Sequence, residues 1–169
     1  ISYHCIVYEV PLPERHWYRW PNSHSRIVSN GCHWIDHFLF LNGYVDVRWS
    51  SAIESSMGDI SVNVELENGA FFTMVLTDRG GSRTGMQDYI ELRTKSRTVK
   101  IENSGKYSAE SESRILRTAS ISKMLSYRLM YKSIGDAVLS GAVGDTLLSV
   151  TQSSKLMLEL DEHLGGTHS

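Results

Sequence analysis

Apolar and polar residues alternate along much of the middle of this chain. The clearest case is Asp59–Glu67, in which every second side chain is aliphatic and the residues between them are polar. This period of two predicts a β-strand with one buried face. Asn68-Gly69 predicts a tight turn, after which Ala70–Thr77 is expected to return antiparallel. One-sided alternation of this kind indicates a sheet that packs on a core with one face and meets water or a partner with the other.

The same alternation, bounded by turn residues, predicts five further strands along the chain. They span Ile1–Val10, Tyr44–Ser51, Tyr89–Arg93, Thr98–Glu102 and Lys106–Glu112. The first is expected to end at the two prolines that follow Val10, because proline cannot donate a hydrogen bond to a strand ladder.

After these strands the apolar spacing becomes that of a helix. Ser120–Leu139 carries leucine, methionine and isoleucine at helical intervals, and Gly135 is expected to interrupt or bend this helix. Asp145 is expected to cap a last helix that ends at Gly165-Gly166. Its predicted apolar stripe is Leu147, Leu148, Val150, Met157, Leu158 and Leu164. Methionine and leucine at this spacing are interpreted as core residues rather than as a cofactor site.

The order of elements is strand, loop, helix, several antiparallel strands and then helices. This order predicts an α+β fold, an open and mostly antiparallel β-sheet with helices packed on one face. The composition, 41% hydrophobic and 21% charged over 169 residues, fits a single ordinary globular domain over residues 1–169.

The strongest functional pattern lies in the stretch Ser29–Gly43. Ser29 and Asn30 are helix N-cap types, and Asn42-Gly43 is typical of a helix end. At 100° per residue the aliphatic and aromatic side chains gather mainly on one side of this helix. His33, Asp36 and His37 gather on the other side, at spacings that make them neighbours on the helix surface.

The spacing of these residues alone leaves three interpretations of the polar cluster open. The side chains can simply be solvated, as on most surface helices. Histidines four residues apart can share a zinc ion with Cys32 or Asp36, but the sequence has no HExxH pattern or second Cys/His pair to support metal binding. The third interpretation is a substrate-binding face.

The loop Glu14–Ser25 is dense in aromatic and cationic residues. Arg19 offers a fork of hydrogen-bond donors beside the apolar plate of Trp20, a combination that suits a sugar or an anionic group on a sugar. The alternative is that the tryptophans pack under the sheet and the arginines are solvated. A second loop, Asp78–Gly85, combines glycines with arginines, but it lacks the P-loop pattern and is interpreted as a loop near the pocket or a subunit edge rather than as a phosphate site.

Charge and cysteine content exclude several classes of protein. The formal net charge is −2 with basic and acidic residues spread along the chain, so no nucleic-acid partner is expected. No apolar run of about 20 residues is present, so no membrane association is expected. Cys5 and Cys32 are the two cysteines, which makes a disulfide framework improbable and a cytoplasmic location the expectation.

The run Arg26–Asp36 carries a family resemblance. A glycine-containing segment leads into a helix with the pattern His-x-x-Asp, here His33 and Asp36. In these residues the chain resembles the glucose–fructose oxidoreductase / inositol dehydrogenase (Gfo/Idh/MocA) family of NAD(P)-dependent sugar oxidoreductases. The resemblance implies that His33 faces the sugar carbon that exchanges hydride, and that Asp36 binds or orients the sugar. Asn30 is expected to orient the His33 ring, since an amide does this in Cys-His-Asn sites.

The resemblance also implies where the rest of the substrate pocket and the cofactor site lie. The loop with Arg19 and Trp20 is expected to border the substrate pocket, and His37 is expected to contact substrate from the helix. No G-x-G-x-x-G follows a predicted strand, so NAD or NADP is expected on a dinucleotide-binding domain upstream of this chain. This chain would then be the C-terminal domain, which binds a sugar, sugar nucleotide or cyclitol and forms a homo-oligomer through its sheet face.

A second function class stays open beside the oxidoreductase. Many members of the family carry an aspartate where this chain has Ser29, and a subgroup carries a glutamate where it has Asn30. The rival interpretation is therefore a non-catalytic assembly or ligand-binding module that kept the fold without the chemistry.

Overall fold

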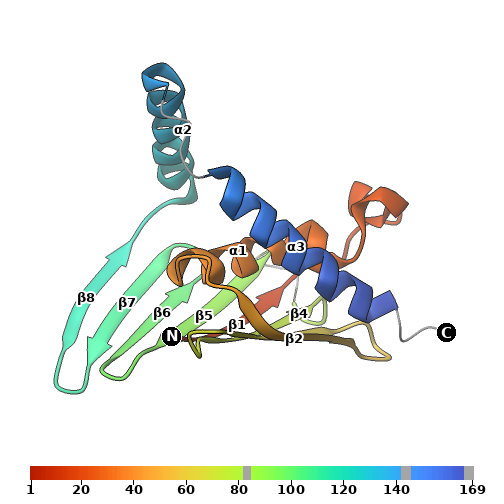
Figure 1. Ribbon diagram of the computed structural model, residues 1–169, viewed down its shortest axis with the longest axis horizontal. Helices are drawn as coiled ribbons and strands as arrows, with labels where there is room; N and C mark the ends of the chain where they lie inside the picture. The colour runs from red at the N-terminus through yellow and green to blue at the C-terminus, as the bar shows by residue number, and fades with distance from the viewer. Residues whose placement is uncertain (82–84, 142–145, 166–169) are drawn as a thin grey trace.

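The computed structural model describes residues 1–81, 85–141 and 146–165. Its base is an eight-stranded sheet with the strand order β2-β3-β4-β1-β5-β6-β7-β8 (Figure 1). β1 pairs with β4 in parallel, and the other neighbouring strands of the sheet pair antiparallel. The predicted α+β fold with an open, mostly antiparallel sheet is therefore confirmed. The strands are β1 (Ser2–Tyr8), β2 (Val47–Glu54), β3 (Ile60–Leu66), β4 (Phe71–Thr77), β5 (Gln87–Arg93), β6 (Arg97–Glu102), β7 (Lys106–Ser111) and β8 (Ile115–Ser120).

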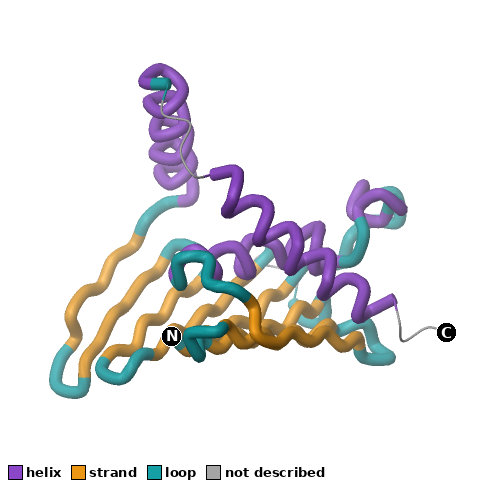
Figure 2. Tube along the Cα trace, in the orientation of Figure 1, coloured by secondary structure: helices purple, strands orange, loops and turns teal. Residues whose placement is uncertain are grey.

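Two of the three helices lie across one face of this sheet. α1 (Cys32–Leu41) crosses above the middle strands, and α3 (Thr146–Gly165) runs beside it and contacts β2 (Figure 2). α2 (Lys123–Ser140) instead projects away from the sheet beyond β8 (Figure 1). The prediction that helices cover one face of the sheet therefore holds for one half of the sheet. On the same face, helices cover β6–β8 less than they cover the other strands.

The hydrophobic core lies between the sheet and the covering helices α1 and α3. β3 shows the alternation that its sequence predicts, with every second residue buried from Ile60 to Leu66. At the centre, Tyr3, Phe38 and Phe72 pack with ring centroids 5.1–6.0 Å apart, a range in which aromatic pairs attract. Most of the core of the described residues comes from β1, β3, β4, α1 and α3, and Ile27, Ala52, Ala70 and Ile90 add to it.

The strand predictions are confirmed for seven of the eight strands, with shifts at their ends. β2 begins at Val47 rather than Tyr44 and runs to Glu54, with a register shift between Val47 and Trp49. β8 was missed. All of its side chains are exposed at the edge of the sheet, so no buried face imposes alternation on its sequence.

The helix predictions need two corrections in α2 and one in α3. α2 continues through Gly135 without interruption, from its Ser122 cap to Gly141. Its apolar residues were interpreted as core, but they are exposed in this structure: Met124, Leu125, Leu129, Met130 and Ile134. The buried stripe of α3 is Leu156, Leu160 and Leu164, whereas Val150 and Leu158 are exposed. The predicted cap Asp145 lies outside the described residues.

Candidate functional site

The helix that carries His33 begins earlier than its sequence predicts. Ile27–Gly31 forms a π-helical turn that continues directly into α1. Ser29 and Asn30 therefore lie inside helical backbone, and their prediction as N-cap residues is wrong. The predicted end is confirmed, because Gly43 adopts a left-handed φ of 65° that glycine accepts without a steric cost.

Close packing explains the glycine at the junction of these two helical segments. A Cβ atom on Gly31 would lie 2.9 Å from Cε of Met74, at the flexible end of a side chain on β4. The π-helical turn therefore packs closely on β4 at Gly31, and a larger residue there would require the Met74 side chain to shift.

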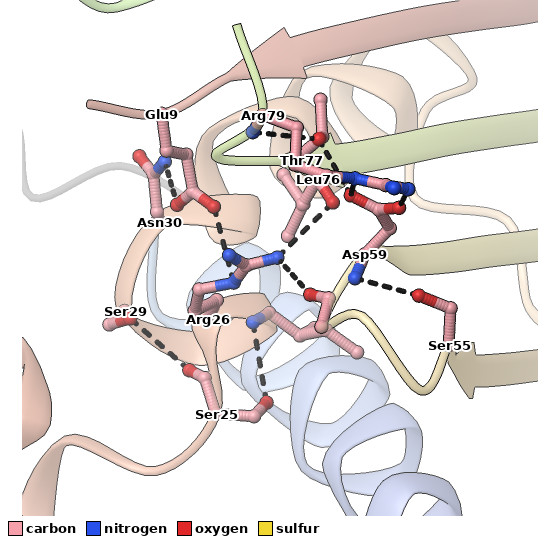
Figure 3. A network of polar contacts seen from close by, with 12 residues as sticks. Glu9, Ser25, Arg26, Ser29, Asn30, Ser55, Asp59, Leu76, Thr77 and Arg79 are labelled. Atoms are coloured by element: carbon pink, nitrogen blue, oxygen red, sulfur yellow. Dashed lines mark hydrogen bonds and ion pairs between the residues drawn. The ribbon is translucent and has the colours of Figure 1, made fainter. Parts of the chain in front are cut away.

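A buried carboxylate anchors the same turn from the other side. Glu9 follows β1, is 7% exposed, and accepts a hydrogen bond from the amide nitrogen of Asn30 at 2.6 Å (Figure 3). Nε of Arg26 forms an ion pair with the second carboxylate oxygen of Glu9 at 3.2 Å. Burial raises the pKa of the Glu9 carboxyl, while Asn30 and Arg26 act in the opposite direction. The amide nitrogen of Asn30 is thus directed to the end of β1, and its orienting role toward His33 stays a prediction.

Arg26 connects this anchor to two other strands. Its Nη2 donates to the carbonyl oxygen of Gly58 at 2.7 Å and to that of Leu76 at 3.2 Å (Figure 3). Gly58 lies in the turn between β2 and β3, and Leu76 lies in β4. One guanidinium therefore links three segments of the sheet to the start of α1, in the fixed donor geometry that arginine provides.

Asp36 points to α3 rather than to the two histidines of its own helix. Its Oδ1 accepts hydrogen bonds from Ser153 at 2.5 Å and from the Tyr44 hydroxyl at 3.3 Å. Ser153 is 4% exposed, so this contact lies in the α1–α3 interface. The structure does not bring Asp36 together with His33, and its role as a substrate-binding residue stays a prediction.

His33 and His37 line one cavity of about 510 Å³. Its walls come from α1, from the inner face of β5 and β6, and from the first turns of α2. The other described residues that line it are Trp34, Met86, Asp88, Ile90, Ile101, Ser104, Ser126, Tyr127 and Met130. A concave, largely apolar space with a few convergent polar groups is the usual form of a small-molecule site.

His37 forms a hydrogen bond with the Tyr3 hydroxyl. Its Nδ1 lies 3.0 Å from that hydroxyl, and which of the two groups donates depends on the tautomer of the ring. Burial raises the pKa of Tyr3 and lowers the pKa of His37, although the nearby Asp36 carboxylate opposes the second effect. The His37 ring is consequently neutral at pH 7.

Asp88 is a site residue that the sequence prediction missed. It lies in β5, and its side chain is on the same inward face of the strand as those of Ile90 and Leu92. It is 8% exposed and lines the cavity of His33. An aspartate in phase with core residues is a signal that was available in the sequence. It was overlooked because the predicted strand began at Tyr89, two residues after the observed start of β5 at Gln87.

The loop residues Arg19 and Trp20 lie apart from the histidine cavity. Arg19 donates to the carbonyl oxygen of Leu12 at 3.2 Å and lines a separate cavity of about 290 Å³ with Glu9 and Arg26. Trp20 is 61% exposed, so the alternative that it packs under the sheet is wrong. The structure does not bring Arg19 or Trp20 together with His33, and their contact with substrate stays a prediction.

Metal-binding clusters and membrane-spanning helices are both lacking in the described part of the chain. No group of three or more His, Cys, Asp or Glu side chains comes together there in a metal-binding arrangement. No helix within the same ranges is both long enough and apolar enough to cross a membrane.

Solved structures show the same fold. A dehydrogenase from Chromobacterium violaceum matches 99% of this chain with a TM-score of 0.77 at 10% identity. Levoglucosan dehydrogenase in complex with NADH matches 98% with a TM-score of 0.75 at 13% identity. UDP-N-acetylglucosamine 3-dehydrogenase GnnA from Acidithiobacillus ferrooxidans matches 96% with a TM-score of 0.73 at 12% identity. This chain covers 54%, 55% and 53% of those chains, so it spans about half their length.

These likenesses confirm the predicted resemblance to Gfo/Idh/MocA-type dehydrogenases at the level of fold. No protein-family model matches this chain, and no curated protein matches it in sequence.

The buried anchor predicts a stability effect at Asn30. Asn30→Ala removes the donor to a buried carboxylate, which should lower the free energy of unfolding by about 1–3 kcal/mol. Urea denaturation at pH 7 measures this difference. Asn22→Ala is the matched control, because Asn22 is exposed and should change stability by less than about 0.5 kcal/mol. Equal losses in the two variants would contradict the anchoring role.

The lowered pKa of His37 predicts a dependence of stability on pH. Below about pH 6.5 the unfolded chain takes up a proton at this residue while the folded chain does not, so the free energy of unfolding falls as pH falls. His37→Gln keeps an acceptor for Tyr3 and cannot take up the proton. The variant should therefore lose less stability than the unmodified chain between pH 7 and pH 5 in urea denaturation.

The exposed residue Asn22 supplies the control for this measurement. Asn22→Gln neither adds nor removes a titratable group, so it should leave the slope of stability against pH unchanged. If His37→Gln and the unmodified chain lose the same stability on acidification, His37 is not held neutral by burial.

Proposed function

We propose that this chain is the substrate-binding and dimerisation domain of an NAD(P)-dependent oxidoreductase that acts on a sugar, sugar nucleotide or cyclitol. The observation that carries the proposal is the cavity that brings His33 and His37 of α1 to the Asp88 carboxylate. The fold of sugar and sugar-nucleotide dehydrogenases supports the same class of reaction. The chain spans about half of those proteins, so the complete reaction is proposed for a protein that carries a second domain as well.

The described residues do not fit a dinucleotide. Neither α1 nor α2 follows a strand through a glycine-rich turn, so neither offers the backbone donors that hold a pyrophosphate at a helix N-terminus. NAD or NADP would therefore be bound by a dinucleotide-binding domain upstream, and it would supply the exchange of hydride. The residues of this chain would bind the alcohol or ketone, orient it and move a proton.

His33 is the proposed proton-transfer residue. Its ring is exposed at the cavity beside Trp34, so an imidazole nitrogen is accessible to a bound hydroxyl. When an alcohol is oxidised, its C–H hydrogen leaves as hydride and its O–H proton passes to His33. In the reverse direction His33 returns the proton to the oxygen of the ketone. General acid–base help of this kind accelerates reactions typically about 10²–10⁴-fold.

One observation favours the rival function, a non-catalytic module. Ser29 donates to the carbonyl oxygen of Ser25 at 3.2 Å, and the Asn30 amide is engaged with Glu9. The two positions at which the resembled family carries acids thus serve the local structure here. Under this alternative the cavity would bind a ligand without turnover, and His33 would be a binding residue.

His33→Ala separates the two functions. In the protein that carries this domain together with its dinucleotide-binding domain, the substitution should lower kcat and kcat/KM together by at least about 10²-fold, since proton transfer belongs to the transition state. The assay follows NAD(P)H absorbance with a panel of sugars and cyclitols. His163→Ala, at an exposed position on α3, should leave both constants unchanged. Unchanged kcat with a raised KM in His33→Ala would favour the binding module.

The uncovered sheet face generates a prediction about assembly. Several apolar side chains on this face are 37–62% exposed, namely Ile6, Ile53, Val75 and Tyr89. Ile6 and Val75 are cross-strand neighbours on β1 and β4, so the apolar surface crosses the centre of the sheet. Contiguous exposed apolar surface usually marks an interface, and the proposed partner is a second copy of the chain.

Sedimentation tests this assembly. The chain should sediment as a dimer at tens of micromolar, and Ile6→Lys should shift it to monomer because the substitution buries an unpaired charge in the interface. Val150→Lys, on the exposed side of α3, should leave the dimer intact. A chain that sediments as monomer at these concentrations would contradict the proposed dimer.

A further inference from the structure

Asp88 presents an unusual carboxylate to the histidine cavity. Both side-chain donors that reach it from the described residues approach the same oxygen: Oδ2 accepts from the Ser104 hydroxyl at 2.9 Å and from Nε1 of Trp34 at 3.4 Å. The hydrogen bonds of the described residues leave Oδ1 without a side-chain donor. Oδ1 is not among the fully enclosed unpaired atoms of these residues, and Asp88 lines the histidine cavity as well as a second cavity of about 280 Å³.

Among the side chains that the structure describes, no basic group forms an ion pair with Asp88. The ion pairs there involve other carboxylates, and the donors to Asp88 are a neutral indole and a neutral hydroxyl. The two histidines are the ionisable bases that share its cavity, and the pKa of His37 is lowered by burial. A buried carboxylate needs hydrogen bonds to compensate for its lost hydration, and Oδ1 is the acceptor that a ligand can satisfy.

The remaining walls of the cavity fit a ring with one hydroxylated edge. Trp34 and Tyr127 supply aromatic surface, and Ile90, Ile101 and Met130 supply apolar surface. Such walls can cover the C–H faces of a sugar or cyclitol ring, while the hydroxyl groups reach the polar residues.

We infer that Asp88 is a specificity residue of the proposed site, whose Oδ1 accepts a hydroxyl group of an uncharged sugar or cyclitol and rejects sugars that carry a carboxylate or phosphate beside it. This inference rests on the proposed function and narrows its substrate class. A hydroxyl donates to a carboxylate in a strong, charge-assisted hydrogen bond. An anionic group at the same place adds repulsion between like charges.

Ligand binding to the chain itself tests this inference, since binding needs no cofactor turnover. The probes are myo-inositol and D-glucose as uncharged ligands, and D-glucuronate and D-glucose 6-phosphate as matched anions. Ligand-observed NMR titrations detect weak binding of each probe. The uncharged ligands should bind at least about tenfold more tightly than the anions, because a close like charge disfavours the anions.

Asp88→Asn tests the residue with little change in shape. The amide can still accept from Trp34 and Ser104, so thermal unfolding should show a folded variant. Loss of the charged acceptor should weaken the uncharged ligands about tenfold and should bring their affinity close to that of the anions. Asp46→Asn is the matched control, because Asp46 is exposed and lines a different cavity, and it should leave all four affinities unchanged.

Three outcomes overturn the inference: anions that bind the unmodified chain as tightly as uncharged ligands, an Asp88→Asn variant with unchanged preference, or no binding of any probe. The proposed function fails by a different measurement. It fails if the protein with both domains exchanges no hydride with sugars or cyclitols, whatever the preference among ligands. Binding of uncharged ligands that depends on Asp88, together with absent turnover, would support this inference and the binding-module alternative.

Discussion

The position of α1 depends on a buried ionic contact at the end of the central strand. Glu9 lies where β1 ends, and its carboxylate is held by Arg26 and Asn30 from the turn that leads into α1. Arg26 also binds backbone oxygens of the β2–β3 turn and of β4. A charge buried to this extent is costly if any partner is missing. The contact therefore ties the start of the helix to three segments of the sheet.

Because the start of α1 is fixed, its side chains contact three different parts of the molecule: the core, α3 and the histidine cavity. Trp34, Ile35, Phe38 and Leu39 enter the core, and their burial sets the rotation of the helix about its axis. Asp36 and His37 are adjacent in sequence and thus about 100° apart on the helix. This angle sends Asp36 to Ser153 on α3 and sends His37 to Tyr3 and the cavity. Two polar residues of one motif therefore serve different purposes, one in packing and one in the site.

The cavity combines residues that lie far apart in the sequence. His33 and His37 come from α1, Asp88 comes from β5, and Tyr127 comes from α2. Three separate elements therefore contribute to its walls. The arrangement places a neutral imidazole and a buried carboxylate beside one cavity. The same fold in dehydrogenases with 10–13% identity shows that the scaffold tolerates almost complete replacement of its side chains.

The sequence by itself determined the strands with one buried face and the amphipathic helix around His33. In β3 and α1 the period of apolar residues follows directly from which side meets the core, so the pattern is visible without the rest of the molecule. The α+β order and the pairing of β3 with β4 through Asn68-Gly69 were predictable for the same reason. These features depend on short-range geometry.

Tertiary structure decided the features that depend on distant partners. Ser29 and Asn30 have the side chains of N-cap residues, yet the contacts of Glu9 and Arg26 extend helical backbone through them. The apolar stripe of α2 resembles a core stripe, but whether such a stripe is covered depends on what lies beside it, and here it is exposed. Asp88 lines the histidine cavity because the sheet carries β5 to the side of α1 that bears the histidines. A local pattern contains no information about such neighbours, since the folded chain supplies them from distant positions, 21 residues away for Glu9 and Asn30 and 54 residues away for Trp34 and Asp88.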